Sequence, residues 1–321
     1  MERLPLFNNN KEAKINVLVH NDLDGTGCLY LLSKVFGEEN INFIKTSYKS
    51  FVKNFNRLAN DLKENNREKL IVCDLGLNKN QIDKLNLENV KGKLLWLDHH
   101  QWDKEIIDKI KRYGEIVINT ETCATGVVYN YFKDKFNFSE FDKELVELIC
   151  DFDLWKLKKS ITWKLSLALM NYDLEKYRKE KLNKGIVFDD ELESIYEKNE
   201  QKIKELIEKY EKKGIKFNKD NEKILLAFDD RDNLLFITHL FEKLKEKYDT
   251  FIMVDQNGKM SFRGKENVLK YAKAFGGGGH LKAAGAMINY HPFLKKINKL
   301  LFKLKIYPKS KEIREKIEKT N

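Results

Sequence analysis

The stretch Leu94-Leu95-Trp96-Leu97-Asp98-His99-His100 decides the fold prediction for this chain. A run of four apolar residues is typical of a strand that is buried on both faces of a sheet. The run ends in a carboxylate and two imidazoles. In open α/β folds the ends of such strands form the sheet edge where ligands bind. We therefore expect Asp98-His99-His100 to mark a site and look along the chain for its partners.

Similar strands precede and follow this stretch. Ile15–His20 and Leu70–Asp74 are apolar runs that also end in polar residues, and Ile116–Asn119 is a further strand. A weaker strand is predicted over Phe43–Thr46. Helical spacing separates these runs, at residues 28–36, 50–66, 78–87 and 104–113. Alternation of this kind predicts an α/β fold with a parallel sheet and helices on both of its faces.

The 321 residues indicate two domains. From Thr125 the pattern is helical, and residues 190–213 form a long charged helix that can connect two domains. Shorter strands and helices follow from Lys216, which predicts a second, smaller α/β domain. The predicted boundaries are 1–185 for the first domain, 186–215 for a helical linker, and 216–321 for the second domain, whose basic, helical C-terminal tail begins at Pro292.

Composition indicates which binding partners and which cellular compartment to expect. The formal net charge of +10 favours anionic partners, with nucleic acid as the first candidate. No apolar run approaches the ~20 residues of a membrane span, and no signal peptide is expected. The cysteines at positions 28, 73, 123 and 150 lie in or beside apolar segments. They predict buried free thiols in a reducing cytoplasm.

Acidic and imidazole groups follow three of the predicted strands. They are His20, Asp22, Asp24, Asp74, Asp98, His99 and His100, and a fourth contribution comes from Asp151 or Asp153 at the end of a later helix. Several carboxylates in one cleft repel each other, and divalent cations remove that repulsion. Mixed Asp/His ligation without thiolate favours Mn²⁺, Mg²⁺ or Zn²⁺. Two ions bridged by one aspartate would activate water and stabilise charge on a phosphoryl group.

These motifs resemble the DHH phosphoesterase family, whose namesake tripeptide is Asp98-His99-His100. The segment His20-x-Asp22-x-Asp24-Gly25 resembles the family's first motif, with the spacing of RecJ-like exonucleases. The resemblance as a whole is to RecJ-like exonucleases and nanoRNase-type phosphodiesterases. Asp74 resembles the second motif, and Asp151 resembles the later acidic ligand more closely than Asp153 does. The resemblance covers about residues 14–290.

The resemblance implies a site with two Mn²⁺ ions, or with Mg²⁺ as the alternative ion. His20 and Asp22 would bind one ion. Asp24, His99 and Asp151 would bind the other, with Asp74 bridging the two. His100 would face the scissile phosphate, and Asp98 would orient an imidazole. If Asp153 is the late ligand, the assignment of Asp151 is two residues out of place.

A second motif lies in the predicted second domain. The run Gly276-Gly277-Gly278-Gly279-His280 lets backbone N–H groups approach an anion closely, and His280 can donate to a phosphate. Together with Ala283-Ala284-Gly285 it resembles the signature of the DHHA1 substrate domain. Arg263, on a short strand just before, is a second candidate for phosphate contact. Gly277, Gly278, Gly279, His280 and Arg263 therefore form the predicted substrate-binding set.

Aromatic residues are numerous near both predicted sites. Tyr48, Phe51 and Phe55 in the first domain, and Phe152, Trp155 and Trp163 later, could stack on bases. Most of them are expected in the core, because large aromatic side chains at helical spacing usually pack inward.

The sequence thus predicts a Mn²⁺-dependent phosphodiesterase or exonuclease that acts on single-stranded or short oligonucleotides. The first alternative is a hydrolase of small nucleotides, such as a cyclic dinucleotide or 3′-phosphoadenosine 5′-phosphate. The second is a non-catalytic scaffold that binds replication or repair proteins. Preference for RNA or DNA, cleavage polarity, substrate length and oligomeric state stay open at this point.

Overall fold

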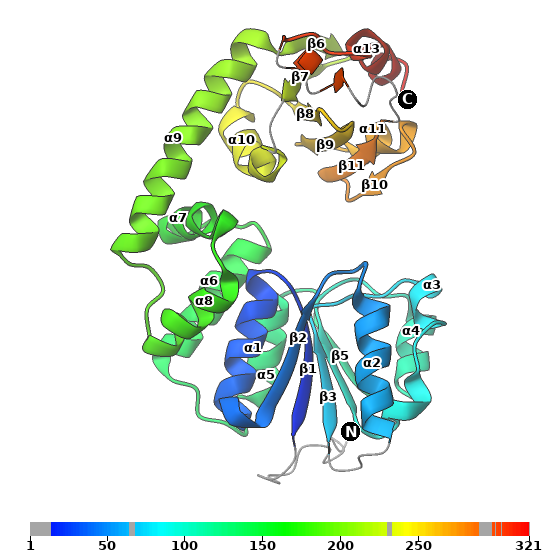
Figure 1. The fold of residues 1–321 in the computed structure, drawn as a ribbon, viewed down its shortest axis with the longest axis vertical. Helices are drawn as coiled ribbons and strands as arrows, with labels where there is room; N and C mark the ends of the chain where they lie inside the picture. The colour runs from blue at the N-terminus through cyan, green and yellow to red at the C-terminus, as the bar shows by residue number, and fades with distance from the viewer. Residues whose placement is uncertain are drawn as a thin grey trace. The chain divides into compact units, whose positions relative to one another are not determined.

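The structure is a computed structural model that describes residues 14–63, 68–229, 233–288, 297–298, 300–302 and 304–320 (Figure 1). The chain divides into two compact units, Met1–Glu193 and Ser194–Asn321. Pro292, where the basic C-terminal tail was predicted to begin, lies outside the described residues, whereas Ser310–Glu318 forms helix α13.

The first unit is built on a five-stranded sheet in the order β2-β1-β3-β4-β5, and all neighbouring strands run parallel. This confirms the predicted fold class. Its strands are β1 (Ile15–His20), β2 (Ile41–Thr46), β3 (Lys69–Cys73), β4 (Leu94–Asp98) and β5 (Gly114–Ile118). Its helices are α1 (Leu23–Phe36), α2 (Phe51–Lys63), α3 (Lys79–Ile82), α4 (Lys104–Ile110), α5 (Ala124–Phe132), α6 (Glu140–Asp153), α7 (Ser160–Ala168) and α8 (Leu174–Glu180).

Helices cover both faces of this sheet, as Figure 1 shows. Helices α1 and α5 lie together on one face, and α2 and α4 lie on the other. The predicted helix over residues 78–87 is shorter than expected. The turn α3 ends at Ile82, and a 3₁₀ turn follows at Leu87–Val90.

Trp96 of β4 is the centre of the core under α2. Its side chain is fully buried and packs against Phe51 and Phe55 at ring-centroid distances of 5.7 and 6.0 Å. Its indole Nε1 donates a hydrogen bond of 3.0 Å to the Leu75 carbonyl. Phe51 and Phe55 are therefore core residues, as the helical spacing predicted.

Helix α9 (Asp190–Lys213) occupies the range that its apolar spacing predicted. The division between the two units falls within its first turn. Leu206 and Tyr210, in the part that belongs to the second unit, are buried.

The second unit contains a mixed six-stranded sheet in the order β10-β11-β9-β8-β7-β6, in which only β7 and β8 are parallel neighbours. Its elements are β6 (Ile215–Lys219), β7 (Glu222–Asp229), α10 (Ile237–Leu244), β8 (Thr250–Asp255), β9 (Lys259–Gly264), α11 (Leu269–Ala274), β10 (Gly278–Gly279), β11 (Ala283–Met287) and α13. Side chains of α11 and α13 pack on one face of the sheet. The second, smaller α/β domain is thereby confirmed.

Candidate metal centre

Three strand ends of the first unit meet at one edge of the sheet. The register pairs Val19 with Cys73 and Cys73 with Leu97, so His20, Asp74 and Asp98 lie at the same level on neighbouring strands. Parallel strands place such ends together at the carboxyl edge of a sheet. The structure thus brings together the three sequence motifs that were predicted to share a site.

The first cluster contains His20, Asp22 and Asp74. His20 Nδ1 lies 2.5 Å from Asp22 Oδ2 and 3.6 Å from Asp74 Oδ2. Asp22 is also the N-cap of α1 and accepts a hydrogen bond of 2.9 Å from the Gly25 amide. A Cβ atom at Gly25 would lie 2.1 Å from the His20 carbonyl oxygen, so glycine is needed for this tight strand-to-helix turn.

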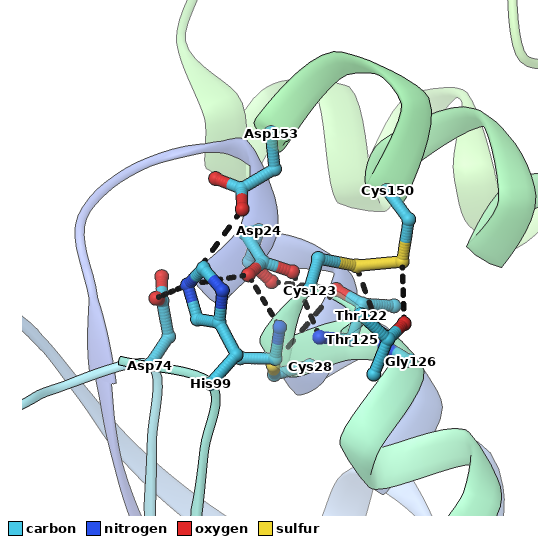
Figure 2. Close-up of a disulfide and its surroundings, with 11 residues drawn as sticks. Asp24, Cys28, Asp74, His99, Thr122, Cys123, Thr125, Gly126, Cys150 and Asp153 are labelled. Atoms are coloured by element: carbon cyan, nitrogen blue, oxygen red, sulfur yellow. Dashed lines mark hydrogen bonds and ion pairs between the residues drawn. A yellow bond between two sulfur atoms is a disulfide. The ribbon is translucent and has the colours of Figure 1, made fainter. Parts of the chain in front are cut away.

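The second cluster contains Asp24, His99 and Asp153, and Figure 2 shows their side chains directed toward one another. His99 Nε2 lies 3.7 Å from Asp24 Oδ2 and 3.6 Å from Asp153 Oδ2. The Asp24 carboxylate also accepts hydrogen bonds of 2.7 and 2.8 Å from the Ala124 and Thr125 amides, which open α5. The positive end of a helix stabilises a carboxylate in that position.

Asp74 lies between the two clusters. Its Oδ1 is 3.4 Å from His99 Nε2, and its Oδ2 faces His20. Asp74 has a φ of 60°, in the left-handed region, directly after β3 ends. Aspartate tolerates that region better than most residues, yet the conformation still costs about 1 kcal/mol. The backbone therefore turns at the residue whose carboxylate faces one imidazole of each cluster.

The buried charges of the site call for a cation. Burial, together with the charges of Asp74, Asp153 and Asp22, holds the pKa of Asp24 well above its ordinary value. Burial likewise raises the pKa of Asp74, and it raises that of Asp153 to about 6. Asp74 Oδ2 and Asp153 Oδ2 are buried without a hydrogen-bond donor. A divalent cation would satisfy these oxygens and reverse the pKa shifts, so the residues fit a metal site.

Asp98 and His100 form a hydrogen-bonded unit beside these clusters, and with Asp74 and His99 they make a third cluster of possible metal ligands. Asp98 is fully buried and accepts hydrogen bonds from His100 Nδ1 at 2.9 Å and from Trp102 Nε1 at 2.6 Å. Burial alone would lower the pKa of His100, but the bond to Asp98 outweighs it and raises that pKa. The carboxylate fixes the plane of the imidazole, which is the orienting task that the resemblance implied for Asp98.

The structure places Asp153, and not Asp151, beside His99. Asp151 accepts hydrogen bonds from the Lys158 and Lys159 amides and from Thr162 Oγ1, at 3.0, 3.2 and 2.7 Å. It therefore anchors the loop that leads into α7 and lies outside the three described clusters. Two residues along a helix differ by about 200° in direction, so only one of the two side chains can face His99. That residue is Asp153.

Tyr48 is a site residue whose position the sequence did not reveal. Its hydroxyl lies 3.0 Å from His100 Nε2, and its ring centroid lies 5.1 Å from that of His20. Tyr48 is 39% exposed, unlike Phe51 and Phe55 on the next helix. Side-chain hydrogen bonds of Thr46 and Ser50 hold the turn that carries it. The available signal was the position of Tyr48 just beyond the end of β2 at Thr46, although that strand ends in no acidic group.

A disulfide joins Cys123 to Cys150 next to the second cluster (Figure 2). The prediction of four free thiols is therefore wrong for this pair, whereas Cys28 and Cys73 are free and buried. Cys123 is the N-cap of α5, next to the amides that bind Asp24, and Cys150 lies one turn before Asp153 on α6. The disulfide thus connects the two helices that position Asp24 and Asp153. The pairing was missed because it depends on the packing of α5 against α6.

Reduction of this disulfide is expected to destabilise the first unit and loosen the second cluster. Opening a loop of 27 residues costs about 3 kcal/mol in the chain-entropy account. Urea unfolding of the wild-type protein with and without dithiothreitol should show this loss, and metal binding should weaken in parallel. The Cys123→Ser/Cys150→Ser variant is the matched control, because it should equal the reduced protein and be indifferent to dithiothreitol. Equal midpoints for all four samples would contradict the assignment.

The predicted substrate-binding residues of the second unit lie at one end of its sheet. Arg263 on β9 is paired with Ala283 on β11, whose neighbour Ala284 pairs with Gly279 on β10. Gly279 has a φ of 137°, and a Cβ atom at Gly277 would lie 2.1 Å from the Gly285 carbonyl oxygen. Gly278 and His280 are exposed. The glycines therefore form a strand and its turn, and their role toward substrate stays a proposal.

Arg263 is held in place within its own unit. Its guanidinium donates hydrogen bonds to Thr238 Oγ1 at 3.0 Å and to the Phe262 carbonyl at 2.9 Å. Burial lowers the pKa of Arg263. Neither partner is a carboxylate, so the charge remains available to an anion.

Comparison with known proteins agrees with this site. Residues 14–151 match the model of the DHH family, N-terminal domain. This part of the chain resembles the DHH phosphoesterases, and it contains all of the clustered Asp and His residues that could hold a metal ion except Asp153. Among curated proteins, oligoribonuclease NrnB of Bacillus subtilis is 21% identical over 295 residues, which cover 84% of this chain and 71% of NrnB.

Solved structures share the fold. RecJ from Thermus thermophilus in complex with Mn²⁺ aligns over 92% of this chain with a TM-score of 0.58 and 13% identity, and this chain spans 52% of that RecJ chain. The pGpG-specific phosphodiesterase PggH from Vibrio cholerae aligns over 94% of this chain and all of its own, with a TM-score of 0.54 and 14% identity. Within the described residues, no helix has the length and apolar character needed to cross a membrane.

Proposed function

We propose that the protein is a Mn²⁺-dependent phosphodiesterase that hydrolyses single-stranded or short oligonucleotides. The observation that carries the proposal is the pair of Asp/His clusters whose imidazoles, His20 and His99, both face Asp74. The name of the relative NrnB and the net charge of +10 support an oligonucleotide substrate. The Mn²⁺ of RecJ supports the choice of ion.

In this proposal each cluster holds one ion. His20 and Asp22 would hold the first, Asp24, His99 and Asp153 would hold the second, and Asp74 would be available to both. When bound, the two ions polarise a phosphoryl oxygen and activate water. The remaining tasks belong to the chain itself. His100, with its plane fixed by Asp98 and its pKa raised, can donate a hydrogen bond from a ring N–H group to an oxygen of the scissile phosphate.

The second unit is proposed to act as the DHHA1-type substrate domain. Its exposed Gly278 and His280, together with Arg263, can bind a phosphate or a strand terminus through N–H donors. Mg²⁺ is the alternative ion, and a cytoplasmic location remains part of the proposal.

Labelled RNA and DNA of 2, 5 and 30 nucleotides, incubated with Mn²⁺ and resolved by size, test this proposal. We expect hydrolysis that stops when the metal is chelated. Turnover of a cyclic dinucleotide or of 3′-phosphoadenosine 5′-phosphate, without turnover of any oligonucleotide, would favour the small-nucleotide alternative. A protein that binds no metal, cleaves nothing and holds a replication or repair protein stably would favour the scaffold.

Metal binding is expected to release protons at neutral pH. Burial would lower the pKa of His20, but Asp22 and Asp74 outweigh it and raise that pKa to about 10. Asp74 and Asp153 likewise raise the pKa of His99 to about 9 despite burial. Both imidazoles are therefore protonated at pH 7 and must lose a proton to bind a cation.

Affinity for Mn²⁺ should rise with pH, by roughly 100-fold per unit below pH 9 and roughly 10-fold per unit between pH 9 and 10, because each released proton contributes tenfold per unit. Titration calorimetry at pH 7 in buffers with different ionisation enthalpies measures the release, which we expect to be about two protons or more. A pH-independent affinity would contradict the proposed ligands.

Tyr48→Phe is expected to reduce turnover by about 5-fold while metal affinity stays unchanged. The substitution removes the hydroxyl that holds His100 Nε2 and leaves the ring in place, and one such hydrogen bond contributes about 1 kcal/mol. Steady-state kinetics and Mn²⁺ titration separate the two effects. Tyr172→Phe is the control, because that hydroxyl bonds to Glu191 at a distance from the clusters. Full activity of Tyr48→Phe would contradict a role for the hydroxyl.

A further inference from the structure

The second unit contains a cavity of about 300 Å³ between α9, the end of β7 and the C-terminal segment. Its lining contains four lysines and one glutamate. Lys202, Lys209 and Lys213 come from α9, and their spacing of seven and four residues places them on one face of the helix. Lys305 faces them from the C-terminal segment. The cavity is therefore strongly positive.

One of these lysines is neutralised by the protein. Lys209 Nζ lies 2.8 Å from Asp229 Oδ2. Asp229 is 1% exposed and also accepts hydrogen bonds from the Tyr210 hydroxyl and from Asn233 Nδ2. This buried network fixes one side of the cavity, because each of its members is held by another.

The other lysines are not neutralised. In the part of the chain that the structure describes, no carboxylate lies within ion-pair distance of Lys202, Lys213 or Lys305. Lys213 and Lys305 lie close together, and the charge of Lys305 is the main cause that lowers the pKa of Lys213. Two ammonium groups that face each other repel, and an anion between them would convert repulsion into attraction.

The backbone holds Lys305 in an unfavourable conformation. Its φ is 62°, in the left-handed region, where glycine or asparagine would be accommodated more easily. The amides of Lys305 and Ile306 donate to the Phe302 and Leu301 carbonyls, at 3.0 and 2.8 Å, and so end the preceding helical turn. A lysine at this position brings its ammonium group to the cavity although the left-handed conformation disfavours it.

The floor of the cavity is aromatic and rigid. Phe228 stacks on Tyr307 with ring centroids 4.6 Å apart and planes 12° apart, and Phe302 packs edge-on against both rings. A polar rim over such a floor is the usual construction of a small-ligand site.

From these observations we infer that the cavity binds a phosphate group, with Lys213 and Lys305 as its principal contacts. The site is distinct from Arg263 and from the glycine run in the same unit. The phosphate can belong to a nucleic-acid strand or to a free nucleotide, because both present negatively charged phosphate oxygens to the lysines. The inference goes beyond the proposed function, since it concerns binding and requires no hydrolysis.

Binding to the intact protein in EDTA tests the inference without turnover. One series measures adenosine 5′-monophosphate by titration calorimetry, and the other measures a labelled single-stranded 30-mer over a range of salt concentrations. The variants are Lys213→Gln, Lys305→Gly and their combination. Lys305→Gly removes the side chain at a position where glycine suits the backbone, so the fold is preserved.

Lys309→Gly is the matched control. Lys309 has a φ of 66°, like Lys305, but it pairs with Glu312 and does not line the cavity. Loss of its side chain removes an equal charge from an equal backbone conformation. A change seen in Lys305→Gly and absent from Lys309→Gly therefore reports on the cavity and excludes a general effect of net charge.

Each outcome decides the inference. If the double variant weakens binding of the 30-mer and reduces the salt slope by about 1.4, or roughly 0.7 for each lost contact, the cavity binds a strand phosphate. If the double variant binds the mononucleotide at least 10-fold more weakly than the wild type and binds the 30-mer equally well, the ligand is a free nucleotide. If both ligands bind the variants and the wild type equally, the inference is wrong. None of these outcomes depends on metal-dependent hydrolysis. The failure of this inference and the failure of the proposed function can therefore be distinguished.

Discussion

Asp74→Ala is expected to abolish Mn²⁺-dependent hydrolysis of an oligonucleotide. The carboxylate faces both His20 and His99, so its removal takes one ligand from each of the two proposed ions. Loss of such a group removes several kcal/mol of transition-state stabilisation, which corresponds to a decrease of about 10³-fold or more. Single-turnover cleavage of a labelled oligonucleotide and Mn²⁺ titration measure the two consequences. Normal turnover in this variant would contradict the metal assignment.

The backbone at Asp74 requires its own control, because alanine is disfavoured at positive φ. Asp220→Ala provides it. Asp220 has a φ of 52° and is exposed in the turn between β6 and β7 of the second unit. Its replacement carries the same backbone penalty and removes no carboxylate from the clusters. Asp74→Asn is the complementary variant, since asparagine tolerates the left-handed region while it lacks the charge.

Trp96→Ala is expected to destabilise the first unit by about 3–5 kcal/mol, since removal of a fully buried aromatic side chain leaves a cavity in the core. The Leu75 carbonyl also loses the indole N–H as its donor. Denaturant unfolding followed by circular dichroism measures the loss. Trp96→Phe keeps most of the apolar contacts with Phe51 and Phe55 and should lose much less. Equal losses for alanine and phenylalanine would contradict the packing argument.

The sheet and its polar edge were predictable because both depend on local patterns. A buried strand of a parallel sheet is a short apolar run, and residues that follow such runs meet at one edge. His20, Asp74 and Asp98 lie at that edge for this reason. The same argument predicted α9 from the spacing of its apolar residues.

The features that the sequence did not reveal are those whose side-chain direction or pairing is determined by tertiary contacts. Asp151 and Asp153 belong to one helix end, and the loop formed by residues 158–162 determines which of them turns away from the site. The Cys123–Cys150 pair depends on how α5 packs against α6. Tyr48 reaches His100 through a turn held by polar side chains, and no periodic pattern indicates the direction of such a turn.

The carboxylate of Asp24 has a consequence for the order in which the site is assembled. Its two backbone donors at the start of α5 hold it in place by protein contacts alone, just as the Gly25 amide holds Asp22 and Asp98 holds His100. Small zinc domains obtain their fold from the ion, whereas here backbone donors hold two of the proposed ligands, Asp22 and Asp24, by protein contacts. Loading and release of the ions can therefore proceed as a reversible exchange on a folded scaffold. The apoprotein is then a competent acceptor whose occupancy follows the available metal concentration.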